Sequence, residues 1–483
     1  MGFRSAGIAG VMIVGLAALR AEALTVESAT HLLLRTGFGA TPAEVAGFLP
    51  LTREQSVALL LLNAGTDPVT PLPSWSGDYL APPRSDPKDP AATRAARDSY
   101  DSQVREREQD LLHWWFGEMI STHSPLTERL VLFWHGHFTS AMDKVDSPNL
   151  LLDQNLLLRR YALGSFRGLV HAIARDPAML IYLDGEGSVK AHPNENFARE
   201  LMELFTLGEG NYTEQDVREV ARAFTGWRVD RATGLASFDE RRHDAGSKTI
   251  LGRTGNWDGD QAIDIILGQP QAARFIVAEL WRELVSPDPD PRTVEALAAS
   301  FRDADYAMRP LVRSLLLTDQ FWAPSNWGTL VKSPVQLAVG TARLLGLDAS
   351  AAPQVAAAVP PMGEQLLNPP TVKGWPTGDA WVTSATLVAR EAALRRLPMP
   401  LLTAAAARLQ AGVANLQARH EMSAGQGLET LLLPVPVVRA DAAAAAPAGA
   451  GPAAGRGASM PVDPNAAART LRAVLLNPLY QLM

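Results

Sequence analysis

The sequence predicts a mostly α-helical fold: a multi-helix globular domain with long irregular loops. Apolar residues recur at the spacing of one helix face through most of the chain, whereas the alternation of apolar and polar residues typical of strands is nearly absent. One such run comprises Leu111, Leu112, Trp115, Phe116 and Met119. Helices are therefore expected to supply most of the core.

Start signals support the same interpretation. Pro125 follows Ser124 at the position where a first helical turn accepts proline, and Thr213 with Asp216 resembles a capping box. A further helix is predicted from the apolar residues of 263–284, and Leu471 and Val474 belong to a final amphipathic helix in 465–483 that is expected to dock on the main body.

Composition sets the class of protein. The chain has 483 residues, of which 47% are hydrophobic and 20% charged, the balance of a folded globular protein. Its formal net charge of -7 opposes binding to a phosphate backbone, so no nucleic acid partner is expected. Cysteine is absent, which excludes disulfides and Cys-ligated metals. Any metal must be held by His, Asp, Glu or backbone oxygen.

The N-terminus carries the pattern of an export signal. Arg4 precedes an uncharged stretch over 5–19, and Ala21-Glu22-Ala23 has the small residues of a cleavage site. We expect residues 1–23 to be removed and the mature protein to be periplasmic or secreted. The alternative is a membrane anchor, but the stretch is shorter than the roughly 20 residues of a spanning helix. No later segment is predicted to cross a bilayer, so the mature form is expected to have no integral membrane segment.

Two segments interrupt the helical pattern. One lies inside the predicted helical domain, residues 24–439, and the other follows it. Segment 66–90 contains seven prolines and is expected to be an irregular loop. Segment 440–464 is almost entirely Ala, Gly and Pro and is expected to be a disordered linker to the C-terminal helix.

The first candidate for chemistry is the pair His135 and His137. Side chains at i and i+2 of a continuous helix project about 200° apart, so both can reach one metal only if the helix breaks, which Gly136 would permit. The alternative is that both are partly buried polar tips of a packed helix.

The second cluster lies in 192–205. A helical wheel places Asn196, Arg199, Glu200 and Glu203 on one stripe, and the two glutamates are spaced to share a cation or to work as an acid and a base. The structural alternative is that Arg199 neutralises Glu195 and Glu203, each four residues away. Spacing alone favours this alternative.

The third cluster is His243-Asp244, followed by Lys248. A His beside an Asp in a glycine-containing loop can supply metal ligands or a base with its orienting group, and Lys248 can hold an anion. It can equally be a solvated turn.

A fourth candidate is the Gly- and Pro-rich segment 368–381. Its Trp375 and Trp381 can stack on a sugar or another polymer, or can plug the core.

Seven strings taken in order resemble one family, the exported bacterial DUF1800 domain proteins, whose function is unassigned. They are HLLLRTGFG at 31–39, FWHGHF at 133–138, NENFARELME at 194–203, AFTGW at 223–227, HDAGSK at 243–248, PPTVKGWP at 369–376 and LLNPLY at 475–480. The resemblance implies a helical domain, export, and pairing with an exported DUF1501-type protein. The chain departs from common members in lacking a twin-arginine signal and in its Ala/Gly/Pro insert.

Two hypotheses follow for function. In the first, the protein is a metal-dependent hydrolase or oxidase whose divalent metal is bound by His135, His137, Glu200, Glu203 and His243. Mixed imidazole and carboxylate ligands favour zinc, iron or manganese. The candidate catalytic residues are Glu195, Glu200, Asp244 and Lys248. In the second, the protein is a non-catalytic extracytoplasmic scaffold whose loop with Trp375 and Trp381 and whose proline-rich loop hold a partner protein or a surface polymer, while the polar clusters are internal salt-bridge networks. The candidate binding residues are Arg199, Asn196, Trp375 and Trp381.

Overall fold

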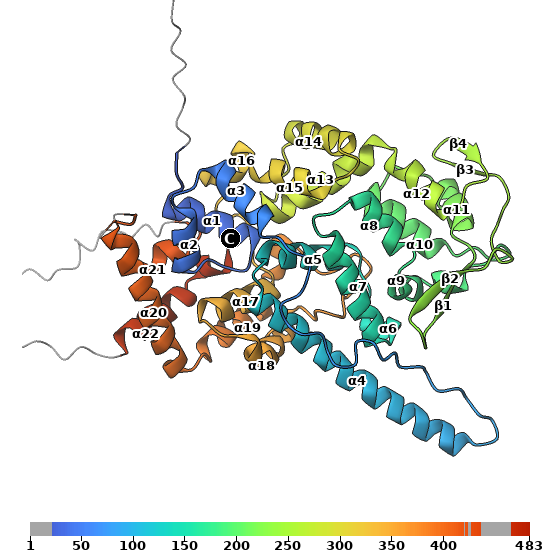
Figure 1. Ribbon diagram of the computed structural model, residues 1–483, viewed down its shortest axis with the longest axis horizontal. Coiled ribbons are helices and arrows are strands. Elements are labelled where there is room, and N and C mark those ends of the chain that lie inside the picture. Colours follow the sequence, from blue (N-terminus) through green and yellow to red (C-terminus); the bar gives the residue numbers. More distant parts are fainter. Residues whose placement is uncertain (1–21, 420, 424–426, 436–464) are drawn as a thin grey trace, which may run out of the picture.

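Helices dominate the computed structural model, which describes residues 22–419, 421–423, 427–435 and 465–483 (Figure 1). The mostly α-helical prediction is confirmed. The predicted linker and nearly all of the predicted signal peptide lie outside the described residues. Within these residues, no single helix has both the length and the apolar composition needed to cross a bilayer. Only two short helices at 42–62, bent by 120°, meet that requirement when taken together.

In the first part of the described chain, every regular element is a helix. Its helices are α1 (Val26–Thr36), α2 (Pro42–Phe48), α3 (Arg53–Leu62), α4 (Pro90–Ser121), α5 (Pro125–His137), α6 (Met142–Val145), α7 (Pro148–Tyr161), α8 (Phe166–Ile173) and α9 (Pro177–Tyr182).

The middle part adds two antiparallel two-stranded ribbons, β1–β2 and β3–β4. Its elements are η1 (Gly185–Gly187), α10 (Glu195–Glu200), η2 (Leu201–Thr206), α11 (Glu214–Ala223), β1 (Trp227–Asp230), β2 (Leu235–Phe238), β3 (Lys248–Ile250), β4 (Arg253–Gly255), α12 (Gly259–Leu267), α13 (Pro270–Leu284), α14 (Pro291–Asp303), α15 (Met308–Leu316) and α16 (Asp319–Trp322). In the ribbons Trp227 pairs with Phe238 and Lys248 with Gly255.

The last part returns to helices separated by irregular chain. Its elements are η3 (Pro324–Asn326), α17 (Pro334–Leu344), η4 (Ala349–Ala351), α18 (Ala352–Ala358), η5 (Pro360–Met362), η6 (Gly378–Trp381), α19 (Ser384–Arg395), α20 (Met399–Ala418), α21 (Leu428–Leu432), α22 (Ala466–Leu475) and η8 (Pro478–Gln481).

Local sequence explains where several helices begin. Pro125 opens α5 directly after Ser124, and Thr213 with Asp216 forms a reciprocal capping box at α11, so both predicted starts are confirmed. Pro90 opens α4 after the proline-rich segment, which contains no helix or strand. At α11 and α4 the Thr213 and Asp89 side chains accept from backbone N–H groups that a helix cannot pair internally, whereas Ser124 makes no such bond at α5.

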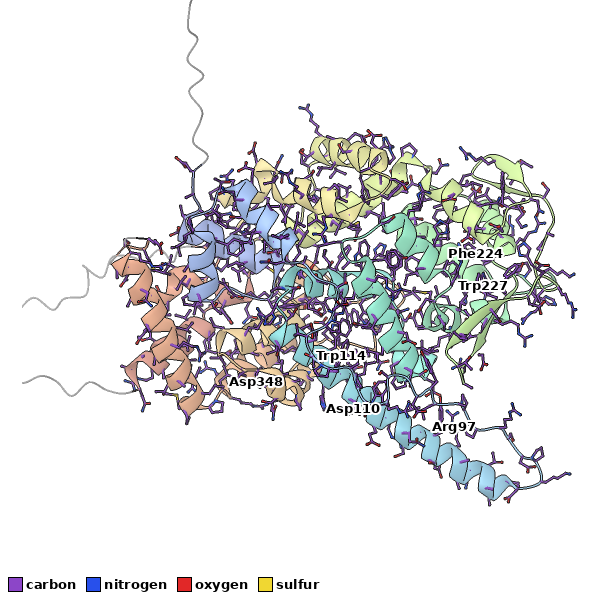
Figure 2. The ribbon with its side chains drawn as sticks, viewed as in Figure 1. Arg97, Asp110, Trp114, Phe224, Trp227 and Asp348 are labelled. Atoms are coloured by element: carbon purple, nitrogen blue, oxygen red, sulfur yellow. The ribbon has the colours of Figure 1, made fainter. Side chains whose placement is uncertain are left out.

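The elements spread between two ends of the molecule (Figure 1). Helices α20 and α22 pack together at one end, whereas α11 and the strands form the other. Between them lie α5 and α7, which pack on each other. The first half of α4 projects away from the body. Figure 2 shows Arg97 on this projecting half and Trp114 where the helix enters the body.

The core contains charged as well as apolar side chains. Trp115, Trp134 and Trp281 are among its largest completely buried residues, and so are four arginines: Arg35, Arg129, Arg159 and Arg390. Arg159 is neutralised by a double hydrogen bond to the buried Glu128. Such buried pairs cost stability when one partner is removed, because the other charge is left without compensation.

Candidate functional site

A large cleft opens at the centre of the molecule. It has a volume of about 610 Å³, within the range of small-molecule sites in proteins. Its walls come from α5, η2, α13 and the segments 330–336 and 372–381. The aromatic residues on its walls are Phe133, Phe275, Trp375 and Trp381, and the carboxylates are Glu203, Glu209, Glu279, Glu283 and Glu364. We call this cavity the central cleft.

One wall of the central cleft is the segment 372–381, and hydrogen bonds fasten its start and the residues just before it to α5 and to Thr139, which follows α5. His135 Nε2 bonds to the carbonyl of Leu366 at 2.7 Å, and the Thr139 hydroxyl donates to the carbonyl of Val372 at 2.6 Å. His135 is therefore a buried anchor for the wall.

Gly374 allows this wall to approach α5 closely. Its φ of +79° favours glycine, and a Cβ at this position would lie 2.6 Å from the carbonyl oxygen of Gly136. The following residue, Trp375, then packs against the His135 ring with 5.3 Å between ring centroids. Gly136 of the string FWHGHF and Gly374 of the string PPTVKGWP are thus in close backbone contact.

The second histidine faces another element. His137 lines the central cleft, and its Nε2 bonds to the carbonyl of Phe205 at 3.1 Å. Phe205 belongs to η2, a π-helical turn that continues α10. Burial lowers the pKa of both His135 and His137 to about 4, so both rings are neutral at pH 7.

The structure does not provide the helix break on which a shared histidine site depends. Helix α5 runs without interruption through Gly136 to His137, so the two imidazoles diverge, as i and i+2 positions must. Among the described residues, no group of three or more His, Cys, Asp or Glu side chains is placed to hold one metal ion. Only His137 and Glu203 of the five proposed ligands line the central cleft. The metal site stays a prediction.

Glu203 lies on the cleft wall between two partners. Its carboxylate accepts a hydrogen bond from Tyr212 at 2.7 Å and lies 3.6 Å from Lys373 Nζ. Lys373 also bonds to Glu209 at 3.0 Å, which lowers the pKa of Glu209. An ion-paired bridge therefore links η2 to the loop that carries Trp375.

The remaining residues of the second cluster lie outside the lining of the central cleft. Arg199 binds both carboxylate oxygens of Glu214, at 2.7 and 2.8 Å, and lies 3.4 Å from Glu195. The predicted pair with Glu195 is thus confirmed, but the predicted pair with Glu203 is wrong. The reason is that α10 gives way to a π-turn at Leu201, which changes the wheel on which both were placed.

Two further residues of this cluster have local roles. The exposed Asn196 donates to Asp184 at 3.1 Å. Burial raises the pKa of Glu200, and the nearby Glu203 carboxylate adds to the rise. Glu200 is therefore close to Glu203 while lying outside the residues that line the cleft.

The third cluster forms a loop closed on itself at the strand end of the molecule; we call residues 243–248 the strand-end loop. Asp244 pairs with Arg222 at 2.7 Å, and His243 bonds to the carbonyl of Thr225 at 2.9 Å. Lys248 is 1% exposed and donates to the carbonyls of Asp244 and Gly246. None of these residues lines the central cleft.

Reasoning from the sequence missed four of the five carboxylates that line the central cleft, namely Glu209, Glu279, Glu283 and Glu364. Glu364 is 3% exposed, lines the central cleft, and accepts a hydrogen bond from the Val335 N–H at 2.9 Å. Glu283 lies on α13 and pairs with the buried Arg129 at 2.8 Å. The sequence position of Glu364, shortly before the segment 368–381, was a weak indication that it lies near the site. Glu283 gave no such indication, because it lies in a predicted amphipathic helix, where a carboxylate is usually solvated.

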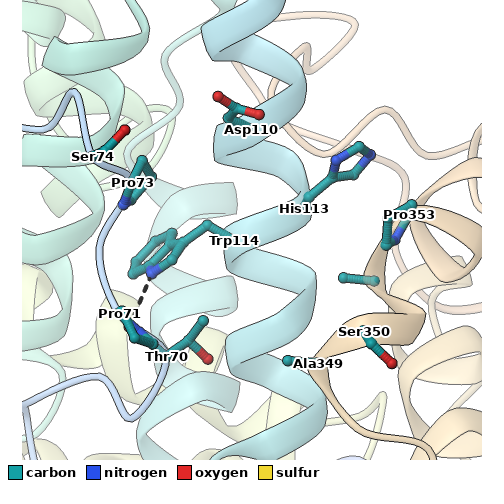
Figure 3. A pocket seen from close by; sticks show the side chains of 11 residues that line it. Thr70, Pro71, Pro73, Ser74, Asp110, His113, Trp114, Ala349, Ser350 and Pro353 are labelled. Carbon is teal, nitrogen blue, oxygen red and sulfur yellow. Dashed lines mark hydrogen bonds between the residues drawn. The ribbon is translucent and has the colours of Figure 1, made fainter.

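A smaller groove of about 360 Å³ lies beside α4 (Figure 3). Its walls are the proline-rich segment, α4 and the start of α18. The Trp114 indole points toward the proline-rich segment and donates to the Thr70 carbonyl at 3.2 Å, while His113 points the opposite way, toward Pro353. The proline-rich segment is thus fastened against α4.

The fold and the central cleft define a class: a mostly helical protein with one large cleft of aromatic and acidic side chains. The chain belongs to the family described as "Protein of unknown function (DUF1800)", whose family model matches residues 31–482. The family predicted from the seven strings is therefore confirmed. No curated protein and no solved structure matches the chain.

Proposed function

We propose that this chain is an exported protein whose central cleft binds a neutral, hydroxyl-rich polymer of the polysaccharide class. The observation that supports this most is the meeting of Trp375 and Trp381 with five carboxylates around a single cavity. A sugar ring has an apolar face of C–H groups that packs on an indole, and hydroxyls that donate to carboxylate oxygens.

The charges of the cleft narrow the class of ligand. Its lining contains five carboxylates but only two permanent cations, Lys373 and Arg282. Both cations already have partners, since Lys373 bonds to Glu209 and Arg282 to Glu279. A polyanionic ligand would therefore find no unpaired cation among the lining residues, whereas hydroxyl donors would find carboxylate acceptors.

Export remains part of the proposal. It rests on the signal-like sequence at 1–23, from which we expect the mature protein to be periplasmic or secreted. A surface polymer is available there. The DUF1501-type partner stays a prediction from the family resemblance.

Titration calorimetry of the purified chain tests the ligand class. Neutral β-glucan and chitin oligomers are expected to bind, and alginate of similar length is not. Trp381→Ala should weaken binding about tenfold, because loss of one aromatic contact costs about 1–2 kcal/mol. The matched control is Trp227→Ala on β1, outside the cleft lining, which should leave binding unchanged. Alginate binding, or equal loss in both variants, contradicts the proposal.

A metal-dependent enzyme is the second candidate, and one observation favours it: His137 and Glu203 share the central cleft. Neutral imidazole with carboxylate suits zinc, iron or manganese. Elemental analysis of the purified chain would then find close to one equivalent of metal, reduced in a His137→Asn/Glu203→Gln double variant. Metal content equally low in both proteins ends this candidate.

A further inference from the structure

We propose that Glu364 and Glu283 form an acid–base pair that hydrolyses a glycosidic bond of the polymer in the central cleft. This inference rests on the proposed binding function and adds a reaction to it. Both carboxylates line the same cavity although they come from distant parts of the chain. Hydrolysis of a glycosidic bond uses such a pair, one protonated and one ionised.

Glu364 has the surroundings of a proton donor. It is 3% exposed, and no Lys or Arg of the described chain forms an ion pair with it. The groups that act on it are the Val335 N–H, the Ser333 hydroxyl, and the charges of Arg390, Arg129 and Glu283. Burial outweighs the stabilising groups and raises the pKa of Glu364 to about 7, so much of it is protonated at neutral pH.

Glu283 has the surroundings of a base. Its side chain is 26% exposed and pairs with Arg129, whose side chain is completely buried. Burial raises the pKa of Glu283, while Arg129 and then Arg35 oppose that rise. Protonating Glu283 would leave a buried guanidinium without its counter-charge, so the ion pair favours the carboxylate.

The reaction needs only water as co-reactant. Glu364 gives its proton to the glycosidic oxygen as the bond from that oxygen to the anomeric carbon breaks. Water forms the new bond to the anomeric carbon and loses a proton to Glu283. Both products carry a hydroxyl at the cut, and solvent returns the proton from Glu283 to Glu364, so atoms and charge balance.

A purely structural role for both residues is the competing explanation. Glu364 accepts from the first turn of α17, and Glu283 neutralises Arg129. These roles account for burial but not for the position of both carboxylates on the wall of one cavity. Isosteric amides separate the two explanations, because a glutamine at 364 can still accept from Val335 but cannot donate a carboxylic proton.

The test measures reducing ends released from neutral β-glucan and chitin oligomers by the purified full chain. Glu364→Gln is expected to lower kcat about 100-fold or more while KM changes less than about twofold, the usual size of a lost general acid. Glu283→Gln should act alike. The control is Glu295→Gln, at an exposed pair on α14, which should keep the wild-type rate.

Outcomes separate the two proposals. Oligomers that bind without being cut overturn the acid–base pair and leave the binding function standing, whereas absence of binding overturns both. A Glu364→Gln variant with the wild-type rate also overturns the pair. If that variant does not fold, the pH profile of the wild type decides: activity must fall as pH rises through about 7, where Glu364 loses its proton. A rate that stays flat from pH 6 to 8 contradicts the inference.

Discussion

The central cleft and the strand-end loop both contain His, Lys and carboxylate side chains, but the strand-end loop lines neither the central cleft nor the groove beside α4. In the strand-end loop, Asp244 and Lys248 bond to protein atoms, to Arg222 and to backbone carbonyls, and close the loop on itself. In the central cleft, Glu283 and Glu364 each have protein partners and still line open space. Residue type therefore does not distinguish a site from a structural network; the presence of a cavity does.

The largest expected effect concerns the glycine that seats the cleft wall. Gly374→Ala should destabilise the protein by about 3 kcal/mol, because a positive φ and a clash with the Gly136 carbonyl combine. Denaturant unfolding measures it, and polymer binding should fall as well. Gly378→Ala is the matched control: its φ is +57°, no atom lies within 4 Å of the added Cβ, and about 1 kcal/mol is expected. Equal losses in both variants would mean that the approach to Gly136 is unimportant.

Acid should weaken the cleft wall. Folding lowers the pKa of His135 from 6.5 to about 4, so the native protein binds fewer protons than the unfolded chain between those values. The contribution of the neutral His135 ring to the free energy of unfolding is complete above pH 6.5. As pH falls toward 4, this free energy decreases by about 2–3 kcal/mol. Melts recorded from pH 7 to 4 should show a smaller decline for His135→Gln than for wild type. The exposed His192→Gln should follow wild type; a parallel decline of all three proteins refutes the assignment.

The strand-end loop should respond in stability alone. Lys248→Met removes the donor to two carbonyls from a residue that is 1% exposed, and we expect a loss of about 2 kcal/mol. Polymer binding at 20 °C should stay within about twofold of wild type, since Lys248 does not line the cleft. Weaker binding without a loss of stability would show that this loop, too, belongs to the site.

The smallest effect is expected at the ion-paired bridge of the cleft. Glu203→Gln should change stability by less than about 0.5 kcal/mol, because its pair with Lys373 is partly exposed and the amide can still accept from Tyr212. Asp244→Asn in the strand-end loop should cost more, about 1 kcal/mol, since Arg222 holds that carboxylate through two nitrogens. Denaturant unfolding of both variants tests whether Asp244→Asn costs more stability than Glu203→Gln. A larger loss for Glu203→Gln would contradict the difference inferred between the central cleft and the strand-end loop.

Local sequence was sufficient for part of the fold. The starts of α5 and α11 follow from Pro125 and from the Thr213 capping box, since caps act within one helical turn. The strands were not predicted, because β1 to β4 are three or four residues long and cannot show a period of two. The π-turn at Leu201 was not predicted for a related reason: η2 has only six residues, too few for apolar spacing to distinguish a π-turn from an α-helical turn.

The site itself was only partly predictable. His137, Glu203, Trp375 and Trp381 were proposed from their motifs and line the central cleft. The sequence did not predict that these four side chains meet at one cavity, because their meeting depends on a hydrogen bond from His135 to a segment more than 200 residues away. Glu364 and Glu283 gave no local signal, since a carboxylate acquires a raised pKa from the packing around it and not from its neighbours in the chain.

Sequence alone determined the helical class and the family of this protein, because helical periodicity, caps and short motifs are encoded within a few residues of one another. Tertiary structure alone decided which polar residues face a cavity. Burial and hydrogen-bond partners are set by elements far apart in the chain, so His, Lys and carboxylate side chains line a cleft in one region and hold a closed loop in another.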